Sequence, residues 1–135
     1  MHAPWQSFRE GLRASLRSKR NLLLFDRLRA SLPDDLDTPG DVVRFLAARD
    51  DGDRGPVLRL LAARVQARQA DADLAFAMLA LGRWRDLDMI YERWRHVFCG
   101  DPEEVVSRIR AGFTAAVLGV RLGKSNCLAG GLSIS

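Results

Sequence analysis

The stretch of sequence that decides the fold reads Leu74-Ala75-Phe76-Ala77-Met78-Leu79-Ala80-Leu81. Drawn as a helix, it is apolar around its whole circumference, so it is stable only if neighbouring elements bury every side of it. It is far shorter than the roughly 20 apolar residues that a membrane-spanning helix needs. No hydrophobic signal segment follows the N-terminus. We therefore predict that residues 74–81 form the central buried helix of a soluble, cytoplasmic protein.

The whole 135-residue chain has the composition of one helical domain. Ala, Leu and Arg dominate it, while Ile, Thr and Tyr are scarce and apolar residues rarely alternate with polar ones. Its 47% hydrophobic and 28% charged residues exclude a disordered chain. We predict an all-α compact bundle of about six helices. Within this single domain, 1–135, we expect a basic amphipathic N-terminal helix over 1–32, a helical core over 38–120 and a frayed tail over 121–135.

The first predicted helix runs from Pro4 to about Leu32 and has an apolar face beside a basic one. With successive side chains about 100° apart around a helix, one face of this segment is apolar and is expected to pack against the core. It contains Trp5, Phe8, Leu12, Leu16 and Leu23. The adjacent face carries four arginines, which we call the arginine ridge: Arg9, Arg13, Arg17 and Arg20.

Capping residues divide the middle of the chain. In the stretch Thr38-Pro39-Gly40-Asp41, Thr38 can cap a helix over 42–49 and Asp41 can complete a capping box. The aspartate-glycine stretch 50–55 lacks the glutamate and the ligand spacing of a calcium loop, which favours a solvated loop. The other boundaries are a helix start at Pro56, its end near Gln69, a cap at Asp71 or Asp73, and a break at Gly82.

The strongest local signal is the stretch Gly100-Asp101-Pro102-Glu103-Glu104. Glycine suits the end of one helix, and the cap, the proline and the capping-box glutamate suit the start of the next. We predict a tight helix-turn-helix corner near residues 99–102. The preceding helix should pack through Leu87, Ile90, Tyr91, Trp94, Val97 and Phe98, and the following one through Val105, Val106, Ile109, Phe113, Ala116, Val117 and Val120.

Residues with catalytic or metal-binding chemistry are few. His2 lies in the N-terminal tail and His96 on the polar face of its helix, while Cys99 and Cys127 lack metal-ligand spacing. Asp86 and Asp88 would point about 200° apart on a helix, which makes a poor acid-base pair. The chain also lacks nucleophile, zinc, Walker and Rossmann motifs. We predict that the protein is not an enzyme and needs no cofactor and no metal.

Positive charge is concentrated at the N-terminus. The whole chain carries a net charge of +4, whereas residues 1–30 hold seven basic and two acidic residues. Four arginines on one ridge can neutralise several phosphates and bind nucleic acid with little sequence preference. Alternatively, the ridge only solvates the helix and pairs with the aspartates of residues 34–53.

The segment from Leu87 to Phe113 resembles the central helical, core-binding domain of bacterial RNA polymerase sigma factors. The resemblance lies in the helix containing Ile90-Tyr91-Glu92-Arg93, in the Gly100-Asp101-Pro102-Glu103-Glu104 corner, and in Val105-Val106 with Phe113 downstream. In that family the second helix binds the clamp helices of the polymerase, and the third opens and reads promoter DNA.

This resemblance implies two sets of contacts. The polymerase-binding residues would be Glu104, Ser107, Arg108 and Arg110, and the nucleic-acid contacts of the third helix would be Arg121, Lys124 and Asn126. The chain departs from the family in the basic side chains of the second helix, in a third helix without stacking aromatics, and in the missing separate DNA-binding domain. We therefore expect a divergent, truncated sigma-like protein that binds RNA polymerase core or DNA without catalysis.

A second function class stays open beside it. In this alternative the chain is a helical protein-interaction module, or a truncated non-functional copy, with no nucleic-acid role. The module would present the stretch Leu128 to Ile134 to a partner or form a homo-oligomer. Neither alternative involves a membrane.

Overall fold

The computed structural model describes residues 3–48, 54–97 and 101–119, which form helices joined by short turns and contain no strand. The elements in these ranges are α1 (Ala3–Arg17), α2 (Lys19–Leu28), the 3-10 helix η1 (Arg29–Ser31), α3 (Pro39–Ala47), α4 (Arg54–Ala67), α5 (Ala72–Gly82), α6 (Trp84–Val97) and α7 (Pro102–Leu118). They pack around a common hydrophobic core. The all-α bundle is thus confirmed, and the described part of the chain holds seven α-helices where we predicted about six.

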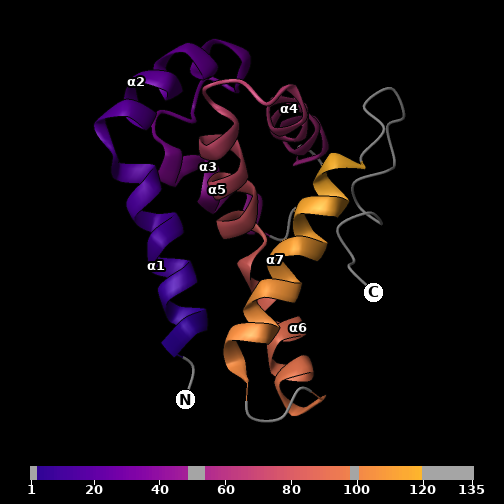
Figure 1. Cartoon of the computed structure of the whole chain (residues 1–135). Coiled ribbons are helices and arrows are strands. Elements are labelled where there is room, and N and C mark those ends of the chain that lie inside the picture. The colour runs from indigo at the N-terminus through magenta and orange to yellow at the C-terminus, as the bar shows by residue number, and fades with distance from the viewer. Residues whose placement is uncertain (1–2, 49–53, 98–100, 120–135) are drawn as a thin grey trace.

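Helix α5 lies at the centre of the bundle, with α1, α3 and α4 packed against it (Figure 1). Leu74, Met78 and Leu79 are completely buried, as expected of a helix that is apolar on every side. Phe76 is partly buried and meets the ring of Phe113 on α7 edge-on, with 5.6 Å between the ring centroids. The prediction of a central buried helix is confirmed.

The N-terminal segment breaks at Ser18, so the prediction of one continuous helix from Pro4 to about Leu32 is wrong. Ser18 has an extended backbone, and its hydroxyl accepts a hydrogen bond from the backbone N–H of Asn21, which caps α2. The buried Asn21 amide in turn donates to the carbonyl of Ser15 at 2.8 Å and to its hydroxyl at 3.0 Å. Serine and asparagine side chains compete with helical hydrogen bonds in this manner, which ends α1 and begins a second helix.

The break also changes which side chains pack. Leu23 is 69% exposed, so its predicted place on the packing face is wrong. In α2 the core positions are taken by Phe25 and Leu28 instead. The helical phase restarts at Ser18, and positions after it no longer continue the face of Trp5, Leu12 and Leu16.

The predicted start of α3 is confirmed. The Thr38 hydroxyl accepts from the backbone N–H of Asp41, and the Asp41 carboxylate accepts from the backbone N–H of Thr38, both at 3.1 Å, which is a complete capping box. Helix α4 begins at Arg54, two residues before the predicted Pro56. Asp71 precedes α5, but its side chain makes no capping hydrogen bond.

Helices α6 and α7 pack against each other and against the rest of the bundle. Gly82 ends α5 as predicted, and Asp101 caps α7 through the backbone N–H of Glu104, with Pro102 in the first turn. Cys99 and Gly100, the middle of the predicted corner, lie outside the described residues.

The packing sides of this helix pair were predicted largely correctly. In α7 the residues Val105, Ile109, Phe113 and Val117 are buried. In α6 Leu87 and Tyr91 are buried, but Val97 is 69% exposed, so its predicted packing role is wrong. Val97 lies about 100° around the helix from the midpoint of the two buried side chains, which leaves it at the edge of the face. Within the described ranges no helix is both long and apolar enough to cross a lipid bilayer.

Candidate functional site

The predicted arginine ridge is divided between two helices. Arg9, Arg13 and Arg17 lie on α1, whereas Arg20 lies on α2 beyond the break. Arg13 pairs with Glu10 at 3.0 Å, and Arg20 donates to the backbone carbonyl of Ala70 at 3.3 Å. Among the described residues, none of these arginines pairs with Asp34, Asp35, Asp37 or Asp41, and the other aspartates of the predicted partner range, Asp50, Asp51 and Asp53, lie outside the described residues.

Arg9 differs from the other ridge residues because it is partly buried. Its guanidinium carbon lies 5.5 Å from the centroid of the Trp84 ring, a cation–π contact that joins α1 to the start of α6. Arg13 and Arg17 are exposed. They follow Arg9 at steps of about 40° around the helix, so the α1 ridge turns from the interior towards solvent.

The predicted polymerase contacts are all exposed on α7. Glu104 and Arg108, one helical turn apart, form an ion pair with 2.8 Å between Glu104 Oε1 and Arg108 Nε. Ser107 lies on the same face by its spacing. Arg110 lies apart from them, with its guanidinium carbon 5.9 Å from the Phe8 ring of α1. The structure thus brings three of the four residues together.

Other predicted site residues lie outside the described part of the chain. These are Arg121, Lys124 and Asn126 of the expected third helix, the stretch Leu128 to Ile134, and the thiols Cys99 and Cys127. Within the described ranges, no group of three or more His, Cys, Asp or Glu residues is placed to hold a metal ion. His96 is exposed, as predicted.

An aromatic cluster fastens α1 to α6. The Trp5 ring stacks on Trp84, with 4.3 Å between centroids, and on Tyr91, with 4.7 Å between centroids. The indole Nε1 of Trp5 donates to Asp88 Oδ1 at 2.9 Å. Asp88 therefore serves as a hydrogen-bond acceptor for a buried indole.

The phenol of Tyr91, in the same aromatic cluster, is also affected by burial. Burial raises the pKa of the Tyr91 phenol above its ordinary value, and the nearby charge of Arg95 offsets part of the rise.

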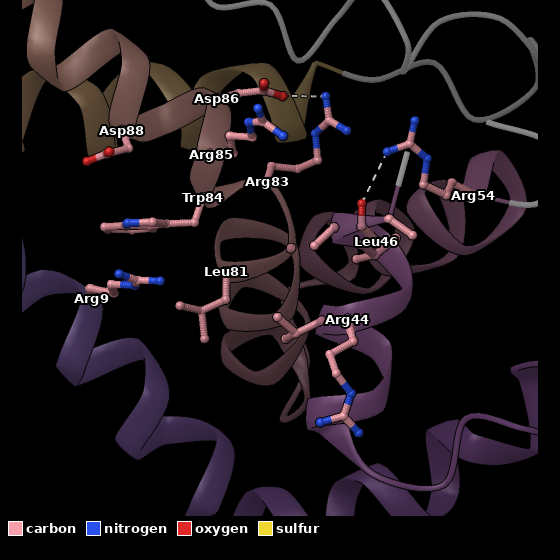
Figure 2. A pocket seen from close by; sticks show the side chains of 14 residues that line it. Arg9, Arg44, Leu46, Arg54, Leu81, Arg83, Trp84, Arg85, Asp86 and Asp88 are labelled. Atoms are coloured by element: carbon pink, nitrogen blue, oxygen red, sulfur yellow. Dashed lines mark hydrogen bonds and ion pairs between the residues drawn. The ribbon is translucent and has the colours of Figure 1, made fainter. Parts of the chain in front are cut away.

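A pocket of about 770 Å³ opens where α1, α3, α4, α5 and α6 come together (Figure 2). Its lining contains the arginines Arg9, Arg44, Arg54, Arg83 and Arg85 and the aspartates Asp86 and Asp88. Figure 2 shows these side chains on separate helices around the junction of α5 and α6, with Arg83 directed at Asp86, Arg54 at the Leu46 carbonyl, and the Arg44 guanidinium extending away from the others. Only Arg9 among the five arginines was predicted to belong to a functional site.

Three of these arginines are positioned by contacts of their own. Arg83 Nη2 lies 2.5 Å from Asp86 Oδ2, and Arg54 Nη1 donates to the carbonyl of Leu46 at 3.2 Å. Arg44 pairs with Asp41 of the capping box. Desolvation is the largest single influence on the pKa of Asp41 and raises it, but hydrogen bonds from the Asp37 backbone, from Thr38 and from Arg44 together outweigh it, so this pKa lies below its ordinary value.

The sequence holds no local signal for this pocket. The five arginines are spread from position 9 to position 85, and only Arg83 and Arg85 are near neighbours in the chain. No spacing rule joins residues from five elements, because their proximity depends on how the helices pack.

No protein-family model matches the chain, and no curated protein or solved structure is significantly similar to it. The likeness to sigma factors thus rests on the residues from Leu87 to Phe113.

Proposed function

We propose that this chain is a sigma-like, transcription-associated protein that binds RNA polymerase or DNA without catalysis. The observation that carries the proposal is the α6–α7 helix pair, in which Asp101 and Pro102 start α7 while Glu104, Ser107 and Arg108 stand exposed on one face. A sigma factor uses the corresponding helix to bind polymerase. The buried side of α7 is occupied by the core, so its exposed side is available for a partner.

The ion pair between Glu104 and Arg108 offers a test of polymerase binding. Exchanging the two charges, with Glu104→Arg and Arg108→Glu, keeps an i,i+4 pair on the helix and inverts the pattern that a partner meets. We expect the exchanged protein to fold and to lose co-purification with core RNA polymerase. The control is Glu103→Gln, a change at an exposed neighbour, which should retain binding.

The α1 ridge supports the DNA-binding part of the proposal. Arg13 and Arg17 are exposed, and each phosphate contact lowers the slope of log affinity against log salt by about 0.9. The variant Arg13→Glu with Arg17→Glu should therefore weaken duplex DNA binding and make this negative slope shallower by about 2. Arg27→Glu, a charge reversal on the exposed surface of α2, is the matched control. An affinity that does not change with salt, together with a failure to retain polymerase, would reject the proposal.

A second candidate function is a helical protein-interaction module, for which α2 provides the supporting observation. Leu22 and Leu23 are 44% and 69% exposed and line a shallow, mainly apolar hollow of about 360 Å³ with Phe25 and Pro39. Exposed apolar side chains that line one hollow are typical of a contact surface. In that case the protein would self-associate at micromolar concentration and Leu22→Ser with Leu23→Ser would make it monomeric, as measured by analytical ultracentrifugation.

A further inference from the structure

The outer side of α2 carries a stripe of four exposed residues, and α2 itself lies at one edge of the bundle (Figure 1). Residues at the spacing i, i+3, i+4 and i+7 lie within about 100° of one another around a helix. Those that form the stripe are Lys19, Leu22, Leu23 and Asp26, which we call the α2 stripe. An apolar centre with charged ends is the composition of a contact surface.

The two charges of the stripe are unfavourable for α2 on its own. Lys19 is the first residue of the helix, where the helix dipole favours negative charge, and Asp26 lies in the last turn, where the dipole favours positive charge. Their Cα atoms lie about 10 Å apart along the helix axis, since they are seven residues apart. Neither forms an ion pair with another described residue. Asp37 lines the same hollow as Lys19, but it is paired with Arg29 at 2.6 Å. Both charges of the stripe are therefore available to a partner.

The α2 stripe is complementary to a second copy of itself that runs in the opposite direction. In a two-fold antiparallel pair of α2 helices centred between Leu22 and Leu23, each Leu22 faces the partner's Leu23. Each Lys19 then faces the partner's Asp26. Asp26 also lies beside the positive end of the partner's helix dipole, so the charges that disfavour the single helix stabilise the pair. A parallel pair would instead bring like charges together at both ends.

We propose that two copies of the chain associate through their α2 stripes, with the two α2 helices antiparallel. The proposal rests on the second candidate function, the protein-interaction module, and names a second copy of this chain as the partner. The hollow of about 360 Å³ beside the stripe, lined in part by Phe25 and Pro39, gives the partner's leucines a surface to pack on. A contact made by one ten-residue helix from each copy is small, so we expect dissociation in the micromolar range.

Two charge-reversal variants test the pairing. Lys19→Glu and Asp26→Lys each turn both facing pairs into like charges, so each variant alone should have a dissociation constant raised about tenfold, measured by sedimentation velocity at low salt. Mixed in equal amounts, the two variants should form a heterodimer with two opposite-charge pairs and regain the affinity of the unaltered chain to within about threefold. Each substitution introduces the charge that the dipole of α2 prefers at that end, so neither should lower the melting temperature.

The matched control is Arg93→Glu, which makes the same charge change as Lys19→Glu on the exposed surface of α6 and should leave the dissociation constant unchanged. Equal weakening by Arg93→Glu and Lys19→Glu would show a response to overall charge and would refute the pairing. A mixture that associates as weakly as the separate variants would also refute it, while self-association through Leu22 and Leu23 would stand. A chain that is monomeric at tens of micromolar would refute the pairing and the interaction module together, and would leave the polymerase-binding proposal to its own test.

Discussion

Replacing Gly82 by alanine should destabilise the protein, although alanine is the better helix former. A Cβ atom built on Gly82 would lie 2.6 Å from Leu46 Cβ and 2.9 Å from Leu46 Cδ1. Leu46 is completely buried in α3, so it has no open space into which to withdraw. The contact at Cβ also persists whichever rotamer Leu46 adopts, so α3 and α5 must move apart.

The magnitude follows from two opposing effects. Extra atoms in a packed core cost about 1–3 kcal/mol. Alanine gains up to about 1 kcal/mol over glycine inside a helix, but Gly82 is the last residue of α5, so only part of this gain applies. We expect a net loss of about 1–2 kcal/mol in the free energy of unfolding, which is a fall of roughly 4–7 °C in Tm for a chain of this length.

The same substitution at Gly11 is the matched control. Gly11 lies inside α1, and a Cβ atom there meets nothing within 4 Å. Gly11→Ala should therefore stabilise the protein by up to about 1 kcal/mol. Urea unfolding followed by circular dichroism measures both variants. If Gly82→Ala were as stabilising as Gly11→Ala, the close approach of α3 and α5 would be refuted.

Three further predictions follow from the described contacts. Asp88→Ala should cost about 1–2 kcal/mol by leaving the buried indole N–H of Trp5 without its acceptor, whereas Asp88→Asn should keep most of the stability; chemical denaturation that finds the two equal would contradict this role. Arg68→Gly should stabilise by about 1 kcal/mol in a thermal melt, because Arg68 has a φ of 54° in the left-handed region. Tyr91 is the single tyrosine, and its raised pKa means that the stability it contributes is present below the ordinary phenol pKa and lost as pH rises through the folded-state value. Absorbance titration at alkaline pH should show ionisation later in the folded protein than in urea, and identical curves would disprove the effect.

Local sequence signals predicted the helix boundaries that depend on neighbouring residues. The capping box of Thr38 and Asp41 and the cap at Asp101 each involve residues three apart, so their hydrogen bonds form whenever the helix does. The break at Ser18 has a comparable local cause, but the Ser15–Ser18–Asn21 hydrogen bonds were not foreseen because the apolar spacing continued across them.

The two candidate sites likewise differ in whether local spacing in the sequence could predict them. The exposed face of Glu104, Ser107 and Arg108 was predictable because their spacing alone puts them opposite the buried valines of α7. The arginine-lined pocket was not predictable, since Arg9, Arg44 and Arg85 lie far apart in the chain and line one pocket only because of how their helices pack.

By itself the sequence determined the all-helical fold class, most helix starts and ends, and the central position of residues 74–81. Helix propensity, capping hydrogen bonds and the apolar surface of residues 74–81 each depend on only a few neighbouring residues, so they can be read from the sequence. Tertiary structure alone decided that Trp5 of α1 stacks on two rings of α6, that Leu23 and Val97 face solvent, and that five arginines line one pocket. These features depend on the angle and depth at which helices pack on α5, and that packing is fixed by side chains distributed over the whole chain.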